Sequence, residues 1–177
     1  MKNKYIAFCI LLLVNIFVFS LVCLVNSELA QWGISIFVPG LFFFSSSILL
    51  DSWDGALVCT ITGLFLDSVY QTPFGLLGIT LPLLCLLGKG WLKNSSNNRP
   101  WRAVLFQVIA NLFTGIFLFA VLFFKIQPYT NLDYTRLIID LILSSIVIIP
   151  LCFWLHNFTN KIVEKLSVNS KININSL

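Results

Sequence analysis

Charged residues are scarce in this chain: Asp, Glu, Lys and Arg make up 10% of its 177 residues, whereas hydrophobic residues make up 58%. A soluble domain usually carries about 25% charged residues. A chain of this size also exposes too much surface to hide so much apolar area in a core of its own. The composition therefore excludes an ordinary soluble domain and predicts an integral membrane protein whose main surrounding is the lipid bilayer.

Groups that perform chemistry are also few. The chain has one histidine, His156, and seven acidic residues, which leaves little material for catalysis. His156 lies where a helix is expected to meet the membrane interface, and we interpret it as an interfacial side chain. The sequence contains no nucleophile–base pair, phosphate-binding loop or cofactor fingerprint. We therefore predict a protein that is not an enzyme, with no catalytic residues, no metal site and no cofactor.

The five cysteines do not suggest a metal site either. All of them lie within or beside apolar runs, and none forms a CxxC pair. We interpret them as buried thiols that pack as small hydrophobic groups. A nucleic-acid partner is not expected, because the net charge of +4 comes from basic residues at the ends of apolar runs and not from a basic cluster.

The N-terminus resembles a signal peptide only in part. Lys2 and Lys4 precede an apolar run over residues 5–25, but no A-x-A-like cleavage site follows. At 21 residues the run is long enough to cross a bilayer. We therefore expect a first transmembrane helix that is retained.

Short polar breaks divide the chain into apolar stretches. The stretch 56–87 is interrupted at 67–73, which leaves runs of 11 and 14 residues, too short to cross a core of about 30 Å. Both runs become long enough if they extend into the neighbouring turns. We predict an all-α integral membrane protein, with residues 1–160 as a single six-helix transmembrane domain and 161–177 as a short polar cytoplasmic tail. The expected spans are 5–25, 34–50, 53–71, 72–92, 103–124 and 136–156.

The distribution of basic residues predicts the orientation of these spans. With the N-terminus in the cytoplasm, nine basic residues fall on cytoplasmic segments, four of them in a loop over 88–102, and two fall on the outer side. This is the bias of the positive-inside rule. The acidic turn at 51–54 would also be cytoplasmic, and acidic residues contribute little to orientation. We interpret Asp51 and Asp54 as a solvated turn beside an interfacial Trp53, in preference to a pair of metal ligands.

Asp67 is the most informative polar residue. An aspartate in mid-membrane costs about 2.5–3.5 kcal/mol on insertion scales, so it should face protein or water. Gly63 lies one helical turn earlier on the same face, where it allows close approach of another backbone. Gly75 and Gly78 offer a matching small face on the next helix. We favour a node that packs helices together or binds a partner. The alternatives are a re-entrant turn with a solvated aspartate, and a proton relay or substrate ligand.

Other polar residues within the spans have simpler interpretations. Asp140 follows Arg136 at the spacing of a local helical ion pair, and we expect the two to neutralise each other at the outer interface. The amides of Asn15, Gln107 and Asn111 are expected to form hydrogen bonds between helices.

Residues 63–76 resemble the MreD family of bacterial rod-shape-determining proteins. The family has Gly-Leu-x-x-Asp, a short stretch of polar to small residues, and then Pro-x-Gly-Leu. The matching residues in this chain are Gly63, Leu64, Asp67, Pro73, Gly75 and Leu76. A weaker similarity covers 101–107, where a basic loop leads into a span, and the hydropathy profile agrees along the chain.

The resemblance implies a non-enzymatic component of the cell-elongation complex in the bacterial inner (cytoplasmic) membrane. Such a protein would bind an MreC-like partner, and through it MreB, RodA and a penicillin-binding transpeptidase in peptidoglycan synthesis. The implied fold is that of the six-helix substrate-binding subunits of energy-coupling-factor transporters. The alternative function is therefore a vitamin-type substrate-binding subunit, which would need polar donors on its outer loops, where the chain offers few beyond Gln31, Asn131 and Tyr134. The expected structural or partner node comprises Gly63, Asp67, Pro73, Gly75 and Gly78.

Overall fold

The computed structural model describes residues 2–70, 72–93, 100–125 and 131–174. Within these ranges the regular structure is entirely helical, which confirms the predicted all-α class with six α-helices. The α-helices are α1 (Lys2–Leu29), α2 (Phe42–Leu49), α3 (Ser52–Tyr70), α4 (Leu76–Lys93), α5 (Pro100–Lys125) and α6 (Asn131–Ile174). Of the two short 3-10 helices, η1 (Ala30–Trp32) directly follows α1, and η2 (Pro39–Leu41) leads directly into α2.

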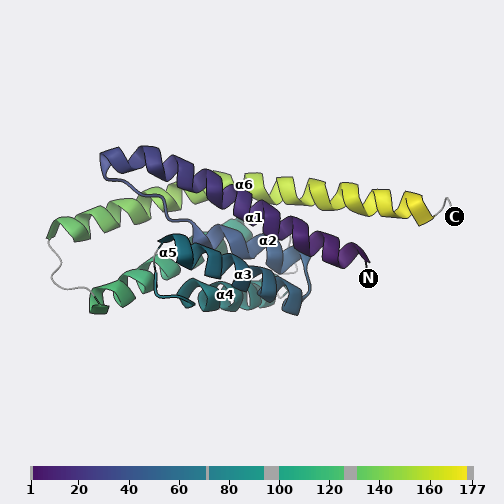
Figure 1. Ribbon diagram of the computed structural model, residues 1–177, viewed down its shortest axis with the longest axis horizontal. Coiled ribbons are helices and arrows are strands. Elements are labelled where there is room, and N and C mark those ends of the chain that lie inside the picture. Colours follow the sequence, from purple (N-terminus) through teal and green to yellow (C-terminus); the bar gives the residue numbers. More distant parts are fainter. Residues whose placement is uncertain (1, 71, 94–99, 126–130, 175–177) are drawn as a thin grey trace.

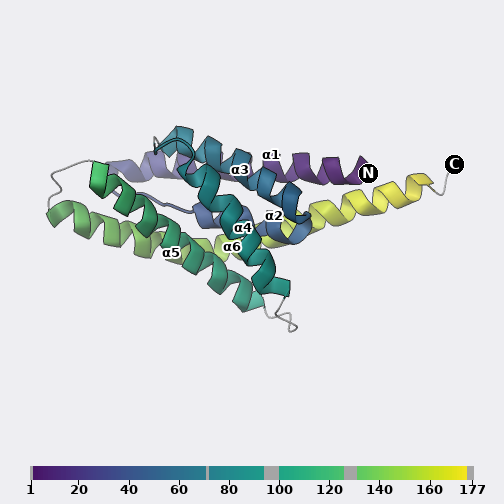
Figure 2. The same cartoon turned by 90° about the horizontal axis from the view of Figure 1, so that it is seen from below.

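The helices form an elongated bundle with both chain termini at the same end (Figure 1). We call this the terminal end and the opposite one the distal end. Among the described residues, three helices are long and apolar enough to cross a membrane, at Tyr5–Trp32, Val104–Val121 and Ile138–Leu155. α3 and α4 form a tighter hairpin, and its turn stops short of the distal ends of α1, α5 and α6 in both views (Figures 1 and 2).

The second predicted span, residues 34–50, is wrong as a continuous helix. Residues 34–38 are not helical, and helical structure begins only at Pro39. Proline disfavours helical geometry in the residue before it and has no N–H to donate. Val38 accordingly has φ −127° and ψ 42°, outside the helical region, and Pro39 stands at the start of η2. The second pass across the bundle therefore consists of a non-helical segment, residues 34–38, followed by η2 and the short α2.

The short helix α2 lies in the middle of the bundle. Its first six residues, Phe42 to Ser47, are buried, and Phe42 and Phe43 are fully enclosed. At its C-terminal end the Lys89 ammonium of α4 donates to the Leu50 carbonyl over 2.8 Å. A cation at this position complements the negative end of the helix dipole. α2 is thus held at the terminal end by a neighbouring helix and enclosed by protein over its first six residues, whereas Ile48 is exposed.

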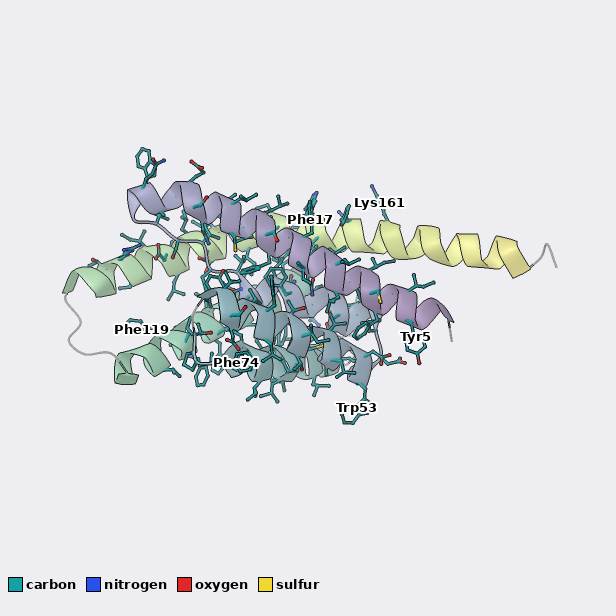
Figure 3. The ribbon with its side chains drawn as sticks, in the orientation of Figure 1. Tyr5, Phe17, Trp53, Phe74, Phe119 and Lys161 are labelled. Atoms are coloured by element: carbon teal, nitrogen blue, oxygen red, sulfur yellow. The ribbon has the colours of Figure 1, made fainter. Side chains whose placement is uncertain are left out.

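The outward faces of the long helices carry exposed apolar side chains, such as Leu13, Ile109 and Ile142. Trp53, at the start of α3, and Phe74, in the turn between α3 and α4, are exposed over 85% and 80% of their surface (Figure 3). The prediction of buried thiols is correct for three cysteines but wrong for Cys9, which is exposed on α1, while Cys23 is half-buried. The three buried cysteines are Cys59, Cys85 and Cys152.

Several predicted connections are partly helical. The expected basic loop over 88–102 contributes residues 88–93 to α4 and 100–102 to α5, while 94–99 lie outside the described residues. α6 has 44 residues, about 66 Å at 1.5 Å per residue, and continues to Ile174 through most of the expected polar tail. The side chains of His156, Asn131 and Tyr134 lie outside the described part, and so do residues 175–177.

Candidate functional site

Asp67 lies in the last turn of α3 and is almost completely buried, with 1% of its surface exposed. One carboxylate oxygen, Oδ1, accepts hydrogen bonds from the Thr72 hydroxyl at 2.5 Å and the Leu77 N–H at 3.0 Å. The other, Oδ2, accepts from the N–H groups of Gly75 at 3.0 Å, Leu77 at 3.1 Å and Gly78 at 3.2 Å. The carboxylate therefore receives three backbone amides and one hydroxyl, and it is not solvated.

These amides belong to the start of α4. The first N–H groups of a helix have no partner within the helix, and the helix dipole favours negative charge there. A capping side chain normally comes from the residue just before the helix. Here Asp67 of the preceding helix supplies the cap, so the carboxylate joins the end of α3 to the start of α4.

The turn between the two helices positions the amides. The Leu76 N–H donates to the Pro73 carbonyl over 3.0 Å, which closes a four-residue turn. Gly75, the third residue of this turn, has a φ of +94°. Type II turns need a positive φ at this position, which glycine adopts without steric cost. Pro73 and Gly75 together direct the Gly75 N–H toward Asp67.

Gly63 lies where α3 touches the first turn of α4. A Cβ atom built on Gly63 would lie 2.6 Å from the Leu77 carbonyl carbon and 2.7 Å from the Gly78 nitrogen. Both neighbours are backbone atoms, which cannot rotate away, so only glycine fits. Gly78 is less constrained, because its Cβ would meet the side chain of Leu64 at 2.8 Å. The close approach at Gly63 brings the amides of Leu77 and Gly78 within reach of Asp67.

The structure thus brings Gly63, Asp67, Gly75 and Gly78 together, with Pro73 in the connecting turn. Among the described residues, the donors to the carboxylate are the Thr72 hydroxyl and the amides of Gly75, Leu77 and Gly78.

A second polar cluster holds the non-helical segment, residues 34–38. The Ser35 N–H and hydroxyl each donate to Asp140 of α6 over 3.0 Å. Ile36 exchanges two hydrogen bonds with the Asn26 amide, at 2.8 and 2.9 Å. The Phe37 N–H donates to the Ser144 hydroxyl over 2.8 Å. Side chains replace the hydrogen bonds that a helix would have made within itself.

Asn111 of α5 completes this cluster at its inner end. Its amide donates to the Phe37 carbonyl over 2.9 Å and accepts from the Gly40 N–H over 3.0 Å. On the other side of α2, Asn15 donates to the Phe42 carbonyl and the Thr62 hydroxyl, each over 3.3 Å. Irregular backbone at membrane depth is tolerated only where protein or water satisfies it, and these amides supply the partners.

The sequence located some of these residues but not their partners. Asn15 and Asn111 form the expected bonds between elements. Gln107 is buried, and within the described part of the chain no donor reaches its Oε1 atom. The expected partner of Asp140 was Arg136, whereas both oxygens of Asp140 accept from Ser35. Asn26 and Ser144 were not predicted as hydrogen-bonding partners. The available signal was the Pro39-Gly40 pair, because it lies inside a span that was expected to be helical.

Aromatic side chains connect the two clusters. Tyr70 ends α3 one turn after Asp67, and its ring centre lies 5.3 Å from that of Phe37 and 5.5 Å from that of Phe19 on α1. Aromatic pairs in this range contribute beyond simple area burial. The end of α3 therefore contacts both the cap of α4 and the 34–38 segment.

The comparison with known proteins agrees with the motif around Asp67. The family model described as rod shape-determining protein MreD matches residues 2–162. The chain belongs to the MreD family. The match covers all of the earlier helices and α6 as far as Ile162, so the Asp67 cap and the 34–38 segment both lie within the MreD region. No curated protein and no solved structure matches the chain, and the expected likeness to transporter subunits remains a prediction without support.

Proposed function

We propose that this member of the MreD family is a non-enzymatic scaffold of the cell-elongation complex, embedded in the bacterial inner membrane. The observation that carries the proposal is the family match over residues 2–162, since that family is described as rod shape-determining. The geometry is consistent with a structural role, because both oxygens of the buried Asp67 are occupied by donors of the chain itself. The bilayer surrounds the exposed apolar faces of α1, α5 and α6.

The scaffold acts by binding an MreC-like protein within or beside the membrane. Through that partner it supports peptidoglycan synthesis by RodA and a penicillin-binding transpeptidase under the direction of MreB. The node formed by Gly63, Asp67, Pro73, Gly75 and Gly78 fixes the α3–α4 hairpin and thereby the surface that the partner contacts. This role is supported by the position of the family motif on that node.

We expect the chain to co-purify from detergent with an MreC-like protein encoded in the same bacterium. Tagged chain is expressed with the partner, solubilised and captured, and the partner is measured in the eluate. A polytopic membrane protein of unrelated family, captured in the same way, controls for detergent carry-over. Failure to associate, combined with tight binding of a vitamin-type compound, would instead favour the transporter-subunit function.

We expect both termini to lie in the cytoplasm. The proposal rests on the bias of nine basic residues against two and is supported by the location of both termini at one end of the bundle. Reporter fusions after Lys93 and after Leu177 should report a cytoplasmic location, and a fusion after Asn131 a periplasmic one. A periplasmic signal at Leu177 would exclude the six-span arrangement.

A further inference from the structure

The non-helical segment, residues 34–38, is attached to the bundle by side chains of three different helices. Its backbone groups bond to Asn26 of α1, Asn111 of α5, and Asp140 and Ser144 of α6. In a helix, releasing one backbone group disturbs its neighbours, because the bonds are shared along the same ladder. Most of these bonds are made to side chains, beside the bond of the Ile34 N–H to the Leu29 carbonyl at 3.3 Å. Ser35 is exposed, whereas the Ile36 and Val38 side chains lie in the core, so release of the outer part of the segment unwinds no helix but exposes Ile36.

The attachments become more buried from the distal end inward. The Ser35–Asp140 pair is exposed, the bonds of Ile36 and Phe37 are partly buried, and the Gly40–Asn111 bond is buried. Water competes for exposed hydrogen bonds, so the outer pair stabilises the closed position least. The inner contact is tight, since a Cβ on Gly40 would lie 2.8 Å from the Asn111 Cβ.

We propose that residues 34–38 form a strap that closes the distal end of the bundle. The strap closes when Ser35 bonds to Asp140 and opens by releasing Asp140, Asn26 and Ser144 in turn. The Gly40–Asn111 contact is the fixed end about which it moves. The closed strap joins α1, α5 and α6, and its opening moves Phe37 away from Tyr70 at the end of α3. The proposal concerns the chain alone and does not depend on the identity of its partner.

Amide hydrogen exchange of the complete chain in lipid nanodiscs tests the strap directly. Asp140→Ala removes both acceptors of Ser35, and exchange of the Ser35 and Ile36 amides should accelerate by roughly ten-fold or more, the effect of losing one or two hydrogen bonds. Ser144→Ala should extend the acceleration to the Phe37 amide. The Gly40 amide should stay protected in both variants. The Gly75, Leu77 and Gly78 amides at Asp67 serve as internal references and should not change.

Arg136→Ala is the matched control, because Arg136 is exposed on the same helix one turn before Asp140. This variant should leave exchange of the strap as in the unmodified chain. Unchanged exchange at Ser35 and Ile36 in Asp140→Ala would overturn the proposal. Equal acceleration of the strap and of the Asp67 amides would also overturn it, since the segment would then open only with the whole bundle.

Discussion

Replacing Asp67 with leucine is expected to abolish function while the protein still inserts into the membrane. Leucine has no acceptor, so the partly buried N–H group of Gly75 and the buried N–H groups of Leu77 and Gly78 lose their partner together. Each unsatisfied buried donor costs roughly 1–3 kcal/mol, and three of them amount to a large fraction of a typical folding stability of about 5–15 kcal/mol. The measurement is complementation of a deletion strain, scored by cell shape, with membrane levels checked by blot.

Asp67→Asn is the graded control for this prediction. Its amide oxygen can still accept from one or two of the donors, but its NH2 group faces N–H groups and cannot accept from them. Asparagine should therefore retain more function than leucine and less than aspartate. If Asp67→Leu cells keep their rod shape at normal protein level and the variant still binds its partner, the cap is not required for function.

Placing even one methyl group on Gly63 is expected to separate α3 from α4. The new Cβ of Gly63→Ala would lie 2.6 Å from the Leu77 carbonyl carbon and 2.7 Å from the Gly78 nitrogen, so the helices must move apart. The same movement lengthens the bonds from Leu77 and Gly78 to Asp67. Gly63→Leu should be at least as damaging as Asp67→Asn. The melting temperature in detergent, together with the complementation assay, measures the effect.

Two other glycines of α4 provide matched controls. Gly90→Ala adds a methyl group where no other atom lies within 4 Å, so it should preserve both stability and function. Gly78→Ala meets the end of the Leu64 side chain, which can rotate, so its effect should fall between the two. A Gly63→Ala variant as stable as Gly90→Ala would show that α3 and α4 do not need this close contact.

The cap and the close contact should also depend on each other. Once Gly63→Leu has moved Leu77 and Gly78 away, little of the cap remains for Asp67→Leu to remove. The double variant should therefore lose less stability than the sum of the single changes, as expected of residues in one network.

The sequence by itself determined the class of protein and the long helices. Apolar runs as long as those in α1 and α5 can only be accommodated by lipid. A helix of this length forms its backbone hydrogen bonds within itself, as a membrane span must. The position of the α3–α4 turn was also predictable from local sequence, because the apolar stretch is interrupted between Asp67 and Pro73. The family motif falls on these same residues, which is why it could be found without a structure.

Only the tertiary structure decided how the second pass is built and which groups bind Asp67 and Asp140. Residues 34–50 are apolar enough for a helix, and hydropathy cannot distinguish a buried helix from a buried irregular segment. The difference lies in whether distant side chains supply hydrogen bonds, and the suppliers here, Asn26, Asn111 and Ser144, come from three other helices. Asp140 likewise had a plausible partner one turn away in Arg136, but the groups that donate hydrogen bonds to it belong to Ser35, far away in the sequence. Backbone hydrogen bonds that are satisfied at long range leave no periodic pattern in the chain, so they became visible only once the helices had packed.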